Sequence, residues 1–182
     1  MRAMSEDADR PDSVLVAAYR SGDQAAATEL VRRHAGPVGR FLAALGVARP
    51  DVEDLVQETF FRAFRGLDGW RGDASFRGWI LRIAGNLRKD QFRRDRGRVM
   101  LPIEDHDLPD RADPEGEAGA KEMLRRLEEG IGRLPRLQRE VFLMRAQQGL
   151  EYDAICAALG TTPGAARVHY HHAVKRLKEM MG

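Results

Sequence analysis

The sequence lacks several features that define large classes of proteins. Of its 182 residues only one is a cysteine, Cys156, so no disulfide can form within the chain. No apolar run approaches the roughly 20 residues that a membrane-spanning helix needs. The N-terminal stretch MRAMSEDADRPDS has no apolar segment of the kind found in secretory signals. These absences predict a soluble protein of the reducing cytoplasm, without membrane insertion.

Signs of catalysis are also missing. The sequence has no phosphate-binding P-loop, and no Ser/His/Asp or Cys/His triad is suggested. The acidic cluster of Asp51, Glu53, Asp54 and Glu58 has the ligand type of a nuclease metal site, but no His or Lys constellation accompanies it. A solvated or partner-docking helix face explains this cluster better. We therefore expect no catalytic residue, no resident metal and no cofactor.

The charges of the chain are balanced overall but unevenly distributed. The net charge is +2, yet residues 99–119 carry 1 basic and 7 acidic side chains, while residues 51–98 carry 11 basic and 8 acidic ones. The acidic stretch contains three prolines, no aromatic residue and no helical apolar period, which is typical of a flexible linker. We predict a disordered N-terminus (1–13), a first domain (14–98), an acidic linker (99–119) and a second domain (120–182).

Both domains have the composition of helical proteins. Ala, Leu, Arg and Glu are plentiful, and Val and Ile form no sustained period-two runs, so we expect an all-α fold of two small helical domains. In the first domain, apolar residues recur at helical spacing from Ala27 to Leu45, with a bend expected at Gly36-Pro37, and again from Val52 to Phe64. Ser75 is a candidate N-cap for a third helix, whose apolar side runs from Trp79 to Leu87.

The second domain has the pattern of a helix-turn-helix. Pro135 can begin a helix that ends at Gln148-Gly149, and Tyr152–Leu159 forms the next, shorter helix. Gly160 stands where a left-handed residue is expected, and Thr162 can cap a final helix that begins at Pro163. A short helix, a glycine-containing turn and a basic helix together favour DNA binding.

One face of the final helix is predicted to contact DNA. At 100° per residue, Ala166, Tyr170, Ala173 and Leu177 share the buried face. The opposite face presents Gly164, Val168, His171, His172 and Lys175, with Arg167 and His169 on its flanks. Arg167 is suited to guanine or phosphate, and Val168 to a thymine methyl group. An ordinary solvated face, a metal site at His169 and His172, and a pH-sensitive phosphate contact are the alternatives.

Aromatic residues gather around one glycine-bearing loop. Six of the 12 aromatics lie between Phe60 and Trp79, and 6 of the 11 residues in the following run RKDQFRRDRGR are basic. Aromatic rings beside positive charge suit single-stranded nucleic acid, although Phe60, Phe64, Phe76 and Trp79 are better explained as core. We expect exposed contacts from Trp70, Arg71 and Asp73 in the loop. The amide of Asn86 can read a base edge.

Three segments resemble a known family. DVEDLVQETFFRAF, FRGWILRIAGNLRKDQFRR and LPRLQREVFLMRAQQGLEYDAICAALGTTPGAARVHYHHAVKRL occur in the order found in bacterial sigma factors of the extracytoplasmic-function (ECF) group. The resemblance extends from about Leu15 to Met180, with the acidic linker between regions 2 and 4. It implies a subunit that binds core RNA polymerase, directs promoter-specific initiation and melts the promoter locally. An anti-sigma factor is an expected partner.

The resemblance also implies roles for individual residues. Asp54, Gln57 and Glu58 would dock on the clamp helices of the polymerase β′ subunit, and region 4 would meet the β flap. The minus-ten element would be captured as a flipped base by the loop and the helix after it: Trp70, Arg71, Asp73, Ser75, Asn86, Arg93 and Arg94. The minus-thirty-five element would be read in the major groove by Thr162, Arg167, Val168, His171, His172 and Lys175.

The final helix departs from the family pattern. Where relatives usually read like TVKSRLHRAR, this chain has AARVHYHHAV, with His169, His172 and Val174 in place of more usual basic residues. This leaves open which minus-thirty-five sequence is read. A stand-alone helix-turn-helix regulator is the alternative function. It explains the second domain but leaves the EDLVQETF helix and the aromatic loop without a role, and tight duplex binding by the isolated protein would favour it.

Overall fold

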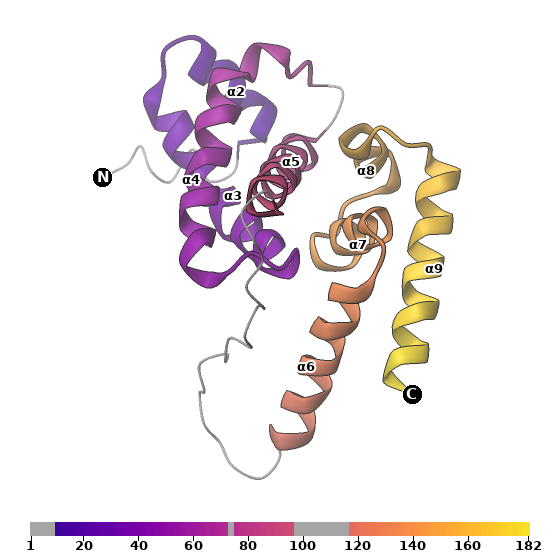
Figure 1. The fold of residues 1–182 in the computed structure, drawn as a ribbon. Helices are drawn as coiled ribbons and strands as arrows, with labels where there is room; N and C mark the ends of the chain where they lie inside the picture. The colour runs from indigo at the N-terminus through magenta and orange to yellow at the C-terminus, as the bar shows by residue number, and fades with distance from the viewer. Residues whose placement is uncertain (1–9, 73–74, 97–116) are drawn as a thin grey trace.

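The computed structural model describes residues 10–72, 75–96 and 117–182, and every regular element within these ranges is helical (Figure 1). The all-α prediction is therefore confirmed. The elements are α2 (Asp12–Arg20), α3 (Gln24–Ala44), α4 (Arg49–Arg65), a 3-10 turn (Leu67–Gly69), α5 (Phe76–Arg96), α6 (Glu117–Arg133), α7 (Arg136–Phe142), a π-helical segment (Leu143–Gln147), α8 (Tyr152–Leu159) and α9 (Pro163–Met181). No described helix is both long and apolar enough to cross a bilayer.

The first half is built around α3. This helix packs on α2, α4 and α5, and its side chains Leu30, Phe41 and Leu42 are fully buried. The predicted apolar stripes are therefore the core-facing ones. The helix continues from Gln24 to Ala44 through the predicted bend, with Pro37 inside it.

Two helices begin a few residues before the predicted bounds of their domains. Helix α2 begins at Asp12, inside the segment 1–13 that was predicted to be disordered, because Asp12 Oδ2 lies 2.7 Å from His34 Nε2 of α3. Helix α6 begins at Glu117, inside the predicted linker, where alanines at 118 and 120 favour the helix. Residues 1–9 of the first segment and residues 99–116 of the predicted linker lie outside the described residues.

The second half is the predicted helix-turn-helix on a supporting pair of helices. Helix α9 packs against α6, α7 and α8. Gly160 has φ +65°, and the Thr162 hydroxyl accepts a hydrogen bond from the Ala165 amide at 3.2 Å, so both turn predictions are confirmed. The helix predicted from Pro135 changes to π-helical geometry after Phe142, and Gly149, at φ +67°, ends it.

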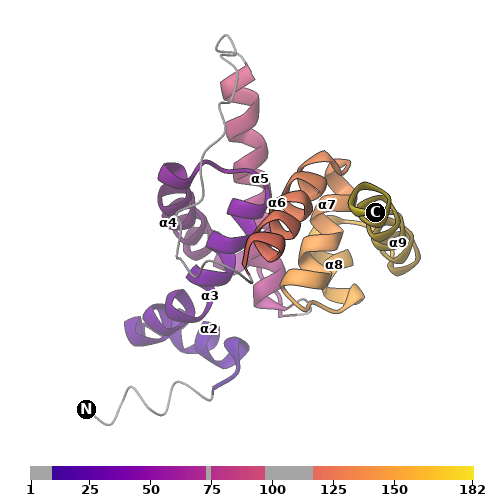
Figure 2. The same ribbon diagram turned by 90° about the horizontal axis from the view of Figure 1, so that it is seen from below.

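The two halves lie against each other. Figures 1 and 2 show α5 beside α8, and α3 also contacts the π-helical segment. The side chain of Gln148 donates to the Pro37 carbonyl at 3.2 Å, and Arg77 donates to the Gln148 carbonyl at 3.3 Å. A Cβ built on Gly78 would lie only 3.3 Å from the Ala154 carbonyl oxygen, so the absence of a side chain lets α5 approach α8 closely.

Candidate nucleic-acid interface

The outer face of α9 is available to a partner. Its inner side is set by Ala166 and Ala173, which are fully buried and small enough to bring α9 close to the helices beneath it. The residues predicted for the outer face are all exposed: Gly164, Val168, His171, His172 and Lys175. Val168 is 51 % exposed, so its methyl groups are available for contact with another molecule.

Arg167 is held at the junction of α8 and α9. Its guanidinium lies over the ring of Tyr152, 5.1 Å from the centroid, and Arg145 approaches the same ring at 5.2 Å. Arg145 is fixed in turn by the Glu151 carboxylate and the Leu150 carbonyl, both at 2.9 Å. This stack restricts Arg167 before any ligand arrives. Sequence reasoning missed Tyr152, although its place as the first residue of α8 was predicted.

The histidines of α9 gather no third metal-ligating side chain within the described ranges, so the alternative of a metal site at His169 and His172 gains no support. The rings of His171 and His172 lie 6.2 Å apart. The alternative of a pH-sensitive phosphate contact stays a hypothesis.

Burial raises the pKa of the Cys156 thiol in α8, in keeping with a packing role.

Helix α4 divides cleanly into a buried and an exposed side. Asp54 and Gln57 are exposed, and Glu58 is partly exposed, with its carboxylate 2.7 Å from Arg62 Nε. Phe61 lies one turn further along the same side and is 55 % exposed. The Arg65 guanidinium lies 5.4 Å from its ring centroid. Sequence reasoning missed Phe61, although its spacing of seven residues from Asp54 places it on this face.

The loop before α5 is partly as predicted. Trp70 was expected to be exposed, and this is wrong: it is 7 % exposed and packs edge-on against Phe76, with centroids 5.8 Å apart. The buried indole of Trp70 stabilises this short loop by apolar packing. Arg71 is exposed as expected. Ser75 is confirmed as a cap, since its hydroxyl accepts from the Gly78 amide at 3.0 Å. Asp73 lies outside the described residues.

Asn86, Arg93 and Arg94 are exposed on α5. Asn86 lines a cavity of about 180 Å³ between the two halves of the molecule, together with Lys89 of α5 and Arg136 and Glu140 of α7. Burial raises the pKa of Glu140, against the stabilising charge of Arg136, whose Nη1 lies 2.9 Å from the carboxylate. The amide predicted to read a base therefore borders the second half.

Comparison with known proteins identifies the family. The model of Sigma-70 region 2 matches residues 30–98, and that of Sigma-70, region 4 matches residues 124–177. RNA polymerase sigma factor NccH of Alcaligenes xylosoxydans xylosoxydans is 31 % identical, over 93 % of this chain and 94 % of its own. The ECF RNA polymerase sigma-E factor of Haemophilus influenzae is 32 % identical, over 86 % and 87 %. The chain belongs to the ECF group of sigma-70 factors. Like other sigma factors, it directs promoter-specific transcription by RNA polymerase.

The fold agrees with solved sigma factors. The structure of CnrH in complex with the cytosolic domain of CnrY is similar with a TM-score of 0.72 and 28 % identity, covering 93 % of this chain and 96 % of that one. The sigma factor RpoE of Bartonella quintana has the same fold, with a TM-score of 0.66 and 20 % identity. Helices α4 and α5 lie within the region 2 match, and most of α9 lies within the region 4 match, so the candidate surfaces belong to the two sigma regions.

Proposed function

We propose that three surfaces of this sigma factor divide the work of promoter recognition. The exposed side of α4, with Asp54, Gln57 and Glu58, docks on the clamp helices of the core polymerase. The loop around Arg71 and the exposed side of α5 receive the minus-ten element, and the outer face of α9 receives the minus-thirty-five element. The observation that carries the proposal is the exposure of polar and basic side chains on α9, opposite a buried alanine face.

The chemistry of each surface suits its proposed ligand. Arg93 and Arg94 supply positive charge for the DNA backbone, and the Asn86 amide both donates and accepts hydrogen bonds, as base-edge reading requires. On α9, Arg167 and Lys175 supply salt-sensitive contacts, and Val168 supplies an apolar one. The protein needs no catalytic residue and no cofactor for this task, because the polymerase performs the chemistry.

We also infer a protein regulator and a cytoplasmic location. The similar protein CnrH has been solved in complex with the cytosolic domain of CnrY. By this similarity, and by the family resemblance, an anti-sigma factor would bind this chain. Its site of action would be the cytoplasm, where core polymerase and promoter DNA are found.

The test is binding to purified core polymerase, followed by transcription in vitro from the promoter upstream of the protein's own gene. We expect specific transcripts that disappear when Asp54 and Gln57 are both replaced by alanine. Glu128→Ala, an exposed acidic position on α6, is the matched control and should leave transcription unchanged. Failure to bind polymerase, combined with salt-sensitive binding to duplex DNA, would instead identify a stand-alone regulator.

A further inference from the structure

Helix α2 contacts Leu67 and Trp70, which directly precede Arg71 in the proposed minus-ten loop, although α2 lies outside the matched sigma region. The region 2 match begins at residue 30, whereas α2 ends at Arg20. The Arg20 Nη2 donates to the Leu67 carbonyl at 2.6 Å and to the Trp70 carbonyl at 2.8 Å. One guanidinium thus holds two carbonyls of a turn about fifty residues away in sequence.

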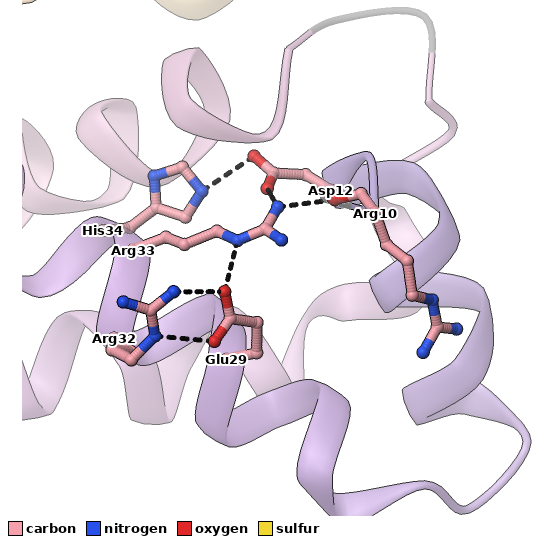
Figure 3. A network of polar contacts seen from close by, with 6 residues as sticks. All are labelled: Arg10, Asp12, Glu29, Arg32, Arg33 and His34. Carbon is pink, nitrogen blue, oxygen red and sulfur yellow. Dashed lines mark hydrogen bonds and ion pairs between the residues drawn. The ribbon is translucent and has the colours of Figure 1, made fainter. Parts of the chain in front are cut away.

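Helix α2 is itself fixed to α3 by an ionic network (Figure 3). Asp12 contacts His34 at 2.7 Å and Arg33 at 3.1 Å, and Arg33 also donates to the Arg10 carbonyl at 2.6 Å. The Glu29 carboxylate binds Arg33 at 2.7 Å, which ties the network together. Because α2 cannot easily move on α3, Arg20 acts from a rigid base.

The network also reaches the other end of the loop. The His34 ring lies 5.3 Å from the ring of Phe76, the first residue of α5, and Phe76 packs on Trp70. The loop is therefore held at Leu67 and Trp70 by Arg20, and at Phe76 by packing on α3. Without these contacts the backbone of the loop would be conformationally free, because the loop contains Gly66, Gly69 and Gly72.

Fixing the backbone at Trp70 determines how the next residues leave the turn. Arg71 follows directly and is exposed, and Gly72 has φ +83°. A binding loop that is ordered before its ligand arrives loses less conformational entropy on binding. Such an advantage applies to any ligand contacted by Arg71.

We propose that Arg20 is a positioning residue for capture of the minus-ten base. It does not touch DNA. Its two hydrogen bonds fix the backbone at Leu67 and Trp70, and so the position from which Arg71 meets an unstacked base, so that α2 is a functional extension of region 2. The inference rests on the proposed function, because it assumes that this loop receives single-stranded promoter DNA.

The experiment measures binding of the complete sigma factor with core polymerase to single-stranded minus-ten oligonucleotides. Abasic sites are introduced one position at a time. In the unchanged protein, one position should be much more sensitive than its neighbours, because the missing base can no longer contact the loop. Arg20→Met should reduce that position-specific sensitivity about tenfold or more, because the loss of one hydrogen bond from a charged group is already worth about that factor. Arg20→Lys, which keeps the charge but not the fork, should be intermediate.

Controls separate positioning from a general loss of structure. Arg40→Met, the same change at an exposed arginine of α3, should behave like the unchanged protein. Affinity for core polymerase and for duplex minus-thirty-five DNA should be unaltered in every variant. Full retention of the abasic sensitivity in Arg20→Met, or an equal loss of affinity at all positions, would overturn the inference. If the unchanged protein shows no sensitive position, the proposed base capture itself fails.

Discussion

Phe61 places a large apolar ring on an otherwise polar helix face. It is 55 % exposed between Glu58 and Arg65, on the side of α4 that carries Asp54 and Gln57. Protein interfaces concentrate their binding energy in a few aromatic residues surrounded by polar ones. This arrangement makes Phe61 the expected anchor of the docking surface.

Phe61→Ala is therefore expected to weaken binding to core polymerase by about 2 kcal/mol, or roughly thirtyfold in the dissociation constant. The melting temperature should change little, because the ring is not part of the core. Val14→Ala removes a side chain that is 42 % exposed on α2 and is the matched control. Equal affinities for the Phe61 and Val14 variants, measured by titration of labelled protein, would show that the ring is not an anchor.

Under the proposed function, in which Arg167 contacts the minus-thirty-five element, Tyr152 acts on DNA through Arg167 rather than directly. Its ring lies under the Arg167 guanidinium, and a cation–π contact at an exposed site is worth about 0.5–1 kcal/mol. Tyr152→Leu should weaken holoenzyme binding to duplex minus-thirty-five DNA by roughly two- to fivefold, which is the same energy expressed as a ratio. Tyr152→Phe should not. In an Arg167→Leu background, the Tyr152→Leu change should add nothing, and an additive effect would disprove the coupling.

At the scale of elements, the ion pairs within α3 that hold Arg33, which also contacts Asp12 of α2, predict a sensitivity to acid. Hydrogen bonds from Arg32 and Arg33 lower the pKa of Glu29 to about 2, whereas its ordinary value is 4.5. A carboxyl group whose pKa is lower in the folded state stabilises that state above its ordinary pKa, and the contribution is lost as the pH falls toward the folded value. The stability contributed by Glu29 should therefore disappear between about pH 4.5 and pH 2.

Glu29→Gln should lower the midpoint of urea denaturation at pH 7 and remove part of its decline between pH 4.5 and pH 2. Glu128→Gln, at an exposed position of α6, should leave the curve as it is in the unchanged protein. Denaturation followed by circular dichroism at several pH values is the measurement. An unchanged acid dependence in Glu29→Gln would mean that other carboxylates dominate the effect.

Elements with local signals were predictable from the sequence, and those fixed by distant contacts were not. The turn between α8 and α9 follows from Gly160, Thr162 and Pro163, which act within a few residues of each other. The start of α2 depends instead on Asp12 meeting side chains more than twenty residues away. Likewise, the burial of Trp70 depends on Phe76 and on hydrogen bonds from α2, so composition alone suggested the wrong exposure.

At the scale of the whole molecule, the contact between the two halves was not foreseeable from a sequence that shows an acidic linker. The contact depends on small features of each half. Gly78 permits the approach of α5 to α8, and Gln148 reaches across to the Pro37 carbonyl. Since the two proposed DNA-binding surfaces lie in different halves, this contact sets the spacing between them in the free protein. Binding at two promoter elements at once requires that the spacing match the promoter.

Gly78→Ala should therefore weaken the contact between the halves. The added Cβ would lie 3.3 Å from the Ala154 carbonyl oxygen and 3.0 Å from the Ser75 hydroxyl, and a backbone carbonyl cannot move aside as a side chain can. We expect a larger radius of gyration in small-angle X-ray scattering, with unchanged helix content. Gly132→Ala in α6 is the matched control, because nothing lies within 4 Å of its added Cβ.

The added Cβ in Gly78→Ala also contacts the Ser75 hydroxyl, which belongs to the first half. A second variant therefore tests the contact between the halves alone. Gln148→Ala takes away the hydrogen bond to Pro37 and leaves the cap of α5 intact, so it should expand the molecule in the same direction. Even if the free protein expands, transcription with core polymerase should fall only slightly. In the complex, docking of α4 would let the polymerase, rather than the contact between the halves, fix their spacing. Scattering curves identical to that of the unchanged protein for both variants would show that Gly78 and Gln148 do not hold the halves together.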